Sequence, residues 1–184
     1  MHLTTKYIRS FMVIAFAMTM FFSCKNNFKE VQQIGMVHSG PLTIAENINT
    51  KYTDSGKLKS ILKSKKMLNF SNRDFAYYEF PEGADLTLYD DNDQENNIIA
   101  DYAIVYDETE LIDLRGNVVL RTHNNDTLFA DQLFYDQKRE WLFTNQPVRF
   151  RRQDEIINGV GFDSNRNFTN AQVLEVNGIV YLNE

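Results

Sequence analysis

Side chains that commonly do chemistry are scarce and widely separated in this sequence of 184 residues. Its three histidines are His2, His38 and His123, and its single cysteine is Cys24. A zinc site needs several such ligands brought together, and no second histidine or cysteine stands near His123 in the sequence. We therefore expect His123 to be a surface residue of a turn, and we expect no metal site.

The acidic run Asp90–Asp93 offers the oxygen ligands that calcium prefers. It lacks the glycine and the distal glutamate of a calcium-binding loop, so we expect a solvated hairpin tip. Gly159–Gly161 is not a phosphate loop, because no helix is expected after it; we expect a kink in a strand. No histidine is positioned to activate a serine or threonine. The sequence thus predicts neither catalysis nor a cofactor, and a hydrolase with an unrecognised carboxylate pair stays as an alternative.

Cys24 is a candidate for covalent modification. It follows a basic start and an apolar run, Phe11–Phe22, that is too short to span a bilayer as a helix. A lone cysteine there resembles a lipobox, the bacterial signal after which the cysteine carries lipid and anchors the mature chain; the alternative is a free cysteine near a cleavage site. Phe21 departs from the usual lipobox. We expect a signal peptide over residues 1–23, the lipidated Cys24 and a tether over 24–41, and the folded domain over 42–184.

The charge balance argues against a nucleic-acid partner. The chain has 19 basic and 25 acidic residues. Removal of the signal peptide takes away Lys6 and Arg9 and no acid, which leaves 17 basic residues against 25 acidic ones and a net charge of −8. Binding to phosphate backbones needs a basic face. With 43% hydrophobic residues, the chain has enough apolar material for one packed domain.

The elements that must position any site are strands, and they follow a repeat of about thirty residues. Two copies cover 100–107 with 112–120 and 130–136 with 142–150, and a more divergent copy covers 159–163 with 174–182. Apolar and polar residues alternate, a period typical of strands with one buried face. The shared columns are Ile112, Leu142 and Leu174; Leu114, Thr144 and Val176; Val118, Val148 and Val180; and Leu120, Phe150 and Leu182. Such a repeat predicts stacked strand pairs that bury a common apolar face.

Polar turns every eight to twelve residues predict an antiparallel all-β domain. Pro81 cannot donate to a ladder and marks a strand edge or a break. No amphipathic helix is expected after residue 24. Strands before the repeats are expected over 42–52, 58–70, 77–83 and 84–89, and turns over 53–57, 90–97, 107–110, 123–126, 136–140, 153–155 and 164–170.

The apolar face of the strands is the remaining candidate site. It forms either a solid core or a trough that stays partly open, and the residues alone do not decide between the two. An open trough would present a continuous apolar lane suited to acyl chains, whose burial is worth about 0.8 kcal/mol per CH₂. The residues expected to line it are Leu86, Leu88, Val105, Ile112, Leu114, Val118, Leu120, Leu128, Leu133, Phe143, Val148 and Phe150.

Several short motifs resemble one known family. They are Leu114–Val118, Leu128–Asp131, Leu133–Asp136 and Ile157–Phe162, together with Tyr78–Gly83 and Asn167–Asn170 upstream and downstream of the repeats. The order and spacing of these motifs resemble the OstA-like β-jellyroll of the lipopolysaccharide export proteins, in particular the LptC family in its Bacteroidetes-like lipoprotein form. The resemblance covers most of the chain from about Ile44 to Leu182.

This resemblance implies a twisted, V-shaped roll of two antiparallel sheets and a non-enzymatic role in outer-membrane biogenesis. LptC-like proteins sit at the periplasmic face of the inner membrane, receive lipopolysaccharide from the LptB, LptF and LptG transporter and pass it to LptA. Many of them have a transmembrane helix where this chain has Cys24.

Jellyrolls of this kind join edge to edge. The strands near 44–52 would face the transporter, and the edge offered to LptA would include Val173, Leu174, Val176, Val180 and Leu182. A scaffold lipoprotein that assembles partners without carrying lipid is the alternative.

Overall fold

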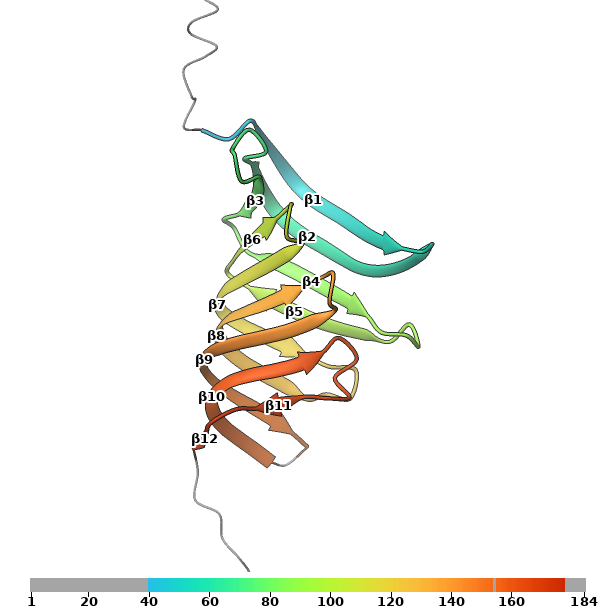
Figure 1. Ribbon diagram of the computed structural model, residues 1–184, viewed down its shortest axis with the longest axis vertical. Helices are drawn as coiled ribbons and strands as arrows, with labels where there is room; N and C mark the ends of the chain where they lie inside the picture. Colours follow the sequence, from blue (N-terminus) through green and yellow to red (C-terminus); the bar gives the residue numbers. More distant parts are fainter. Residues whose placement is uncertain (1–39, 154, 178–184) are drawn as a thin grey trace, which may run out of the picture. The chain divides into compact units, whose positions relative to one another are not determined.

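The structure is a computed structural model that describes residues 40–153 and 155–177. The expected signal peptide and Cys24 lie outside the described residues. Within the described residues the chain forms strands and turns and no helix, which confirms the predicted all-β class (Figure 1). Accordingly, no described segment is a helix long and apolar enough to cross a membrane.

Twelve strands are described, and each pairing between them is antiparallel. They are β1 (Thr43–Asp54), β2 (Lys57–Asn69), β3 (Tyr77–Phe80), β4 (Ala84–Tyr89), β5 (Glu95–Ala100), β6 (Tyr102–Tyr106), β7 (Leu111–Arg121), β8 (Thr127–Asp136), β9 (Trp141–Arg152), β10 (Glu155–Asn165), β11 (Gln172–Val173) and β12 (Val176–Asn177).

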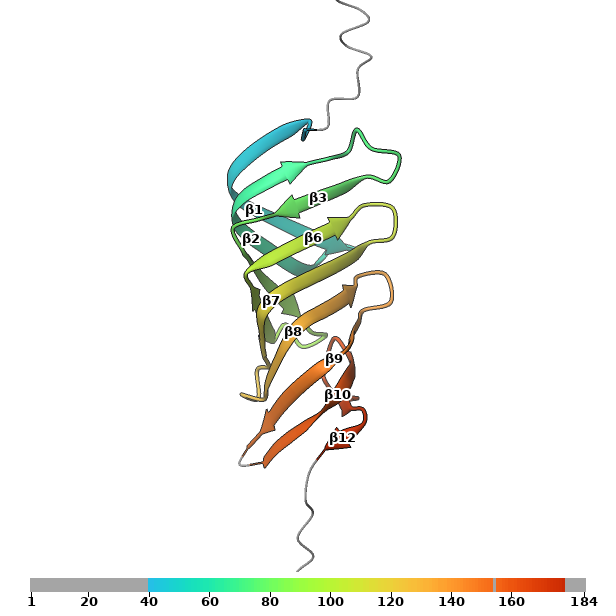
Figure 2. The ribbon, with the colours of Figure 1, turned by 90° about the vertical axis from the view of Figure 1, so that its left-hand side faces the viewer.

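The strands form two layers because the long ones belong to both. The first half of β7 pairs with β6, and its second half pairs with β5. We call the layer that contains β3, β6 and β11 layer A and the layer that contains β4, β5 and β12 layer B. Strands β2, β7, β8, β9 and β10 run from one layer into the other, so the domain is a single folded ladder (Figures 1 and 2).

The bends in the long strands line up as a crease. The ladder register shifts between Arg115 and Val118 on β7, between Ala130 and Phe134 on β8, and between Val160 and Phe162 on β10. An irregularity of this kind inserts extra residues on one strand and bends it. At Gly116, where φ is +73°, the backbone takes a conformation that favours glycine.

The repeat predicted from the sequence corresponds to hairpins. β6–β7 and β8–β9 are joined by four-residue turns at 107–110 and 137–140, thirty positions apart. Pro81 lies just after β3, in the connection to β4, as expected. The expected turn over 90–97 is shorter, because the Asp90 carboxylate accepts hydrogen bonds from the backbone of Asn92 and Gln94 and closes the turn by residue 94.

The third copy of the repeat departs from the prediction. Instead of one strand from 174 onward, the described chain has β11 and β12, two residues each, separated by Leu174 and Glu175. Leu174 is 40% exposed, so its assignment to the buried column of Ile112 and Leu142 was wrong. The chain passes so close to Gly159 that a Cβ there would lie 2.5 Å from the carbonyl oxygen of Leu174.

Candidate functional site

The space between the two layers holds most of the expected lining residues. Buried in one cluster are Leu86, Leu88, Ile112, Leu114, Val118, Leu120, Leu128, Leu133, Val148 and Phe150. Val105 is half-buried and packs against them. Their side chains point inward because the strands alternate between an inner and an outer face, and Arg149 between Val148 and Phe150 is exposed.

Phe143 does not line the interior, so this part of the prediction was wrong. Its neighbours Leu142 and Thr144 are buried, whereas Phe143 is half-buried on the other face of β9. There its ring stacks on Phe134, with ring centroids 5.2 Å apart. The repeat column that holds Ile112 and Leu142 already indicated that Leu142 points inward, whereas the predicted lining set contains Phe143 instead.

Other interior residues were missed by the sequence reasoning. Ile98 and Phe162 are fully buried, and Leu62 and Phe80 belong to the same cluster, as does Leu142, which the repeat had already placed in a buried column. Ile98 directly follows the expected polar turn over 90–97. Its spacing of two positions to Ala100 is nevertheless typical of a strand. Phe162 follows Gly161, where the expected kink obscured the alternation.

An apolar cavity of about 400 Å³ opens at the N-terminal end of the interior. Its walls come from β1 and β2 on one side and from β3, β6 and β7 on the other, and include Tyr52, Leu62, Met67, Tyr78 and Val105. Small-molecule sites commonly occupy roughly 300–1,000 Å³. The interior is therefore neither a solid core throughout nor an open trough throughout, because it is open at this end and filled around β7–β10.

The rim of this cavity does not carry a pair of acidic groups. Among the described residues that line it, Asp107 is the one carboxylate. Likewise, the described part of the chain contains no group of three or more His, Cys, Asp or Glu that could hold a metal ion. His123 lies at the β7–β8 turn, and its backbone donates to the buried Asn96 side chain at 3.0 Å.

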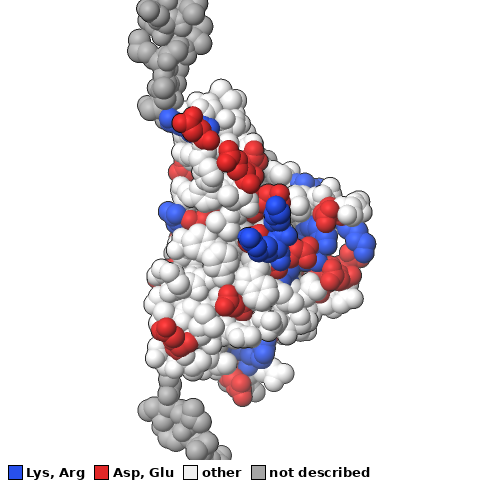
Figure 3. All heavy atoms as spheres, in the orientation of Figure 1, with Lys and Arg blue, Asp and Glu red and all other residues white. Residues whose placement is uncertain are grey.

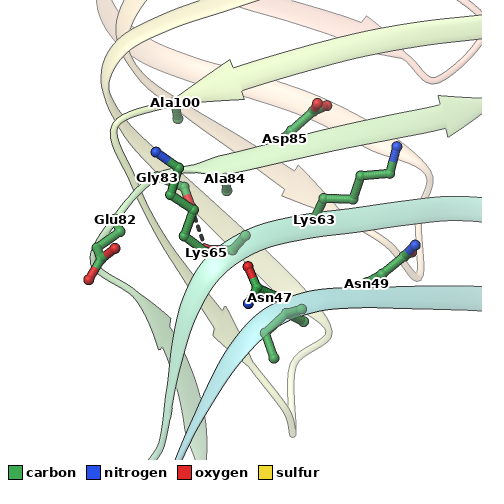
Figure 4. A pocket seen from close by; sticks show the side chains of 11 residues that line it. Asn47, Asn49, Lys63, Lys65, Glu82, Gly83, Ala84, Asp85 and Ala100 are labelled. Carbon is green, nitrogen blue, oxygen red and sulfur yellow. Dashed lines mark hydrogen bonds between the residues drawn. The ribbon is translucent and has the colours of Figure 1, made fainter.

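A second pocket, of about 490 Å³, is shallow and open (Figure 4). It lies between β1–β2 and the start of β4. Charged side chains of both signs reach it, namely Lys63, Lys65, Glu82 and Asp85. Ser64 donates a hydrogen bond to the carbonyl oxygen of Gly83 at 2.6 Å and ties the strands together there.

Contacts of Arg166 with Asp91 and Glu140 bring the free margins of the two layers together, and we call the side of the domain where these margins meet the mouth. The turns at 107–110, 137–140 and 166–171 form the margin of layer A, and those at 90–94 and 122–126 belong to the margin of layer B. Charged side chains of both signs gather where the β1–β2 hairpin and the β4–β5 turn project (Figure 3).

An ion-pair network bridges the mouth at one level. The Arg166 guanidinium donates to Glu140 of layer A and, at 2.8 Å, to Asp91 of layer B. Lys59 of β2 lies 3.3 Å from Glu140, and Asn167 donates to Asp91 at 2.9 Å. We call these five residues the mouth clasp.

The side chain of Arg166 is 1% exposed, and burying an unpaired guanidinium would be costly, so the two carboxylates are needed to hold it. The hydrogen bond from Asn167 lowers the pKa of the Asp91 carboxyl, and the charge of Arg166 adds to this effect against the opposing cost of desolvation.

The two ends of the ladder carry exposed apolar residues. Among the described strands β1 pairs with β2 alone, and Ile44 on it is 60% exposed. At the other end Val176 is 61% exposed and Val173 packs on the core. Val180 and Leu182 lie outside the described residues.

The folded ladder, its apolar interior and the cavity at one end are those of an antiparallel β-jellyroll. The family model described as "Lipopolysaccharide-assembly, LptC-related" matches residues 12–181. The chain therefore belongs to the LptC family, as its motifs predicted. A search of curated proteins found no match. Family membership makes the protein a component of lipopolysaccharide transport, a system with partner proteins that is associated with the inner membrane and periplasm.

Proposed function

We propose that this protein is a non-enzymatic conduit for lipopolysaccharide. It receives the lipid from the LptB, LptF and LptG transporter at its β1 end and passes it to an LptA-like protein at its C-terminal end. The observation that carries the proposal is the apolar cavity beside β1, which continues into the buried interior. Direction comes from the ATP that the transporter hydrolyses.

Acyl chains supply the affinity in this scheme. Burying a dozen methylenes is worth roughly 10 kcal/mol, at about 0.8 kcal/mol each. The cavity lined by Leu62, Met67 and Val105 accepts the first part of a chain. Further along, Leu114, Leu120 and Leu128 fill the space completely, so the layers must part as the lipid advances. The polar headgroup stays in water outside the mouth.

A lipid anchor on Cys24 holds the domain at the periplasmic face of the inner membrane in this proposal. The lone cysteine after an apolar run supports it. Detergent phase partitioning of the wild-type protein and of Cys24→Ser tests it. The wild type should enter the detergent phase and the variant should not; equal partitioning of both would reject the anchor.

A photo-crosslinking amino acid tests the conduit in living cells. It replaces Val105 at the cavity, Val148 deeper in the interior, or Arg149, whose exposed side chain lies over the outer face of β8 at 4.6 Å from the Phe129 ring. We expect lipopolysaccharide adducts at Val105 and Val148 and none at Arg149. Absence of adducts at both interior positions, with the protein folded and at its normal level, would reject the conduit.

The completely filled interior around β7–β10 favours a second candidate, a scaffold that assembles partners without carrying lipid. Leu114, Leu120 and Leu133 are 0% exposed. A scaffold predicts adducts with partner proteins at the two ends of the ladder and no lipid adduct at Val105, which separates it from the conduit in the same set of cells.

A further inference from the structure

The mouth clasp lies across the path that the headgroup of a transported lipid would take. The inference rests on the proposed function, in which acyl chains move between the layers while the headgroup stays outside. A headgroup that is attached to buried chains must project through the mouth at each level that it passes. Arg166, Glu140 and Asp91 close the mouth by linking a turn of layer A to a turn of layer B.

The position of the clasp separates the cavity from the interior further on. It joins the β4–β5 turn to the turns after β8 and β10. From β5 towards the C-terminal end of the ladder, the strands follow in the order β7, β8, β9 and β10. A lipid that enters at the β1–β2 end therefore reaches the clasp region before its chains can lie wholly against β9 and β10.

The ion pairs of the mouth clasp can separate without leaving a buried carboxylate. The Arg166 side chain is buried, but the Asp91 side chain is 68% exposed and that of Glu140 is 41% exposed, and both carboxylates stand on turns. Water can therefore solvate the two carboxylates as soon as they part from the guanidinium. The Arg166 Nε has no hydrogen-bond partner among the described residues, so the closed state leaves one buried donor unpaired there.

We propose that the mouth clasp is a gate that must open for lipopolysaccharide to move from the N-terminal cavity to the C-terminal half of the interior. Arg166 and Asn167 hold layer A to Asp91 of layer B in the resting protein. An advancing lipid forces the layers apart and breaks the contacts to Asp91, and the clasp closes again behind it.

A reversible covalent lock tests the gate. Asp91→Cys and Asn167→Cys are introduced together, since the two native side chains meet at 2.9 Å across the mouth. A short bifunctional methanethiosulfonate reagent bridges the two cysteines, and reduction removes the bridge. The full-length protein, with a photo-crosslinking residue at Val105 or Val148, is assayed beside its transporter with purified lipopolysaccharide.

The control lock joins the last residue of β10 to the turn that follows it, within layer A. Asn165 donates to Thr169 at 2.7 Å, so Asn165→Cys with Thr169→Cys accepts the same reagent without bridging the layers. The wild-type chain, treated in the same way, controls for reaction at Cys24. Because one sample is compared before and after reduction, misfolding of the variant would show as a loss that reduction does not restore.

The gate predicts that the bridged protein keeps its adduct at Val105 and loses its adduct at Val148. The adduct at Val148 should return after reduction, and the control lock should leave both adducts unchanged. Equal adducts at Val148 before and after reduction would overturn the gate while leaving the conduit intact. Failure of the conduit itself looks different, because the adduct at Val105 is then missing from every sample.

Discussion

A few charged and polar side chains are buried in this domain. Arg166 is 1% exposed and Asp136 is 7% exposed, and each is held by charged partners from a turn. Asn96 is fully buried and accepts a hydrogen bond from the backbone of His123. Polar side chains inside a β domain are tolerated when they are paired, and they then restrict which turns can lie beside each other.

The carboxyl group of Asp136 should make the free energy of unfolding depend on pH. Burial would raise the pKa of its carboxyl, but hydrogen bonds from the Arg139 side chain and backbone outweigh this and lower it below the ordinary 3.8. The stabilisation is therefore present above pH 3.8 and is lost as the pH falls through the lowered value. Asp136→Asn should lower the free energy of unfolding by about 1 kcal/mol at neutral pH, since the charged pair with Arg139 is lost.

Urea denaturation of both proteins across the pH range measures this effect. The difference between wild type and Asp136→Asn should shrink as the pH drops below 3.8. Asp131→Asn on the same strand is the control, because Asp131 is exposed and makes no hydrogen bond or ion pair with the described residues. A difference that is constant from pH 7 to pH 3 would contradict the proposed role of the carboxylate.

The inward-facing residues could be predicted from the sequence wherever apolar and polar residues alternate along a strand. Val118 and Leu120 stand two apart and Leu114 stands four positions before Val118, with polar or outward residues between them, and all three are buried. The prediction for Phe143 was wrong, although the repeat had placed its neighbour Leu142 in the buried column. Arg166 could not be found, since an arginine in a polar turn is ordinarily solvated and its two carboxylates lie 26 and 75 positions away in the chain.

At the scale of elements, hairpins set by local turns were predicted well and long-range features were not. The turns at 107–110 and 137–140 follow from polar residues between apolar strands, which are local signals. The crease depends on how β7, β8 and β10 shift register against their neighbours, and a register is a property of pairs. The chain divides into β11 and β12 where it passes close to Gly159 of β10, and this contact between strands has no local signal in the sequence.

We expect the packing of β11 and β12 on β10 to require a glycine at position 159. A Cβ at this position would lie 2.5 Å from the Leu174 carbonyl oxygen and 2.6 Å from a methyl group of Val173. Gly159→Ala should displace β11 and β12 from β10 and destabilise the protein by about 1–3 kcal/mol, because neighbouring backbone must move. Limited proteolysis should then cut within 172–177 much faster than in wild type.

Gly40→Ala is the matched control, because no atom lies within 4 Å of the added Cβ. It should leave both the unfolding curve and the rate of cleavage at 172–177 unchanged. If Gly159→Ala is cut no faster than wild type, the close approach of Val173 and Leu174 to Gly159 is not what holds β11 and β12 in place.

At the scale of the whole domain, the ladder has two different ends. β1 offers twelve residues, ten of them with exposed side chains, whereas among the described residues β11 and β12 offer two residues each on either side of an interruption. Free strand edges are sites for strand addition by another chain. The long edge suits a stable junction, and the short interrupted edge suits a junction that forms and breaks more readily.

Photo-crosslinking at the two ends tests this polarity. A crosslinker at Thr50 of β1 should capture a transporter subunit, and one at Val176 of β12 should capture the LptA-like protein. A crosslinker at Asn145, which is exposed on the outer side of the domain, should capture neither. Capture of the same partner at both ends would refute the proposed direction of transfer.

The crease has a mechanical consequence. Because β7, β8, β9 and β10 each run through both layers, the layers cannot separate as two rigid plates, and a widening at one strand flexes the next strand through their shared hydrogen bonds. Neighbouring strands lie about 4.8 Å apart, so such a widening would travel in small steps. Passage of a lipid would then resemble peristalsis, a local swelling that moves along the roll while the segments ahead and behind stay shut.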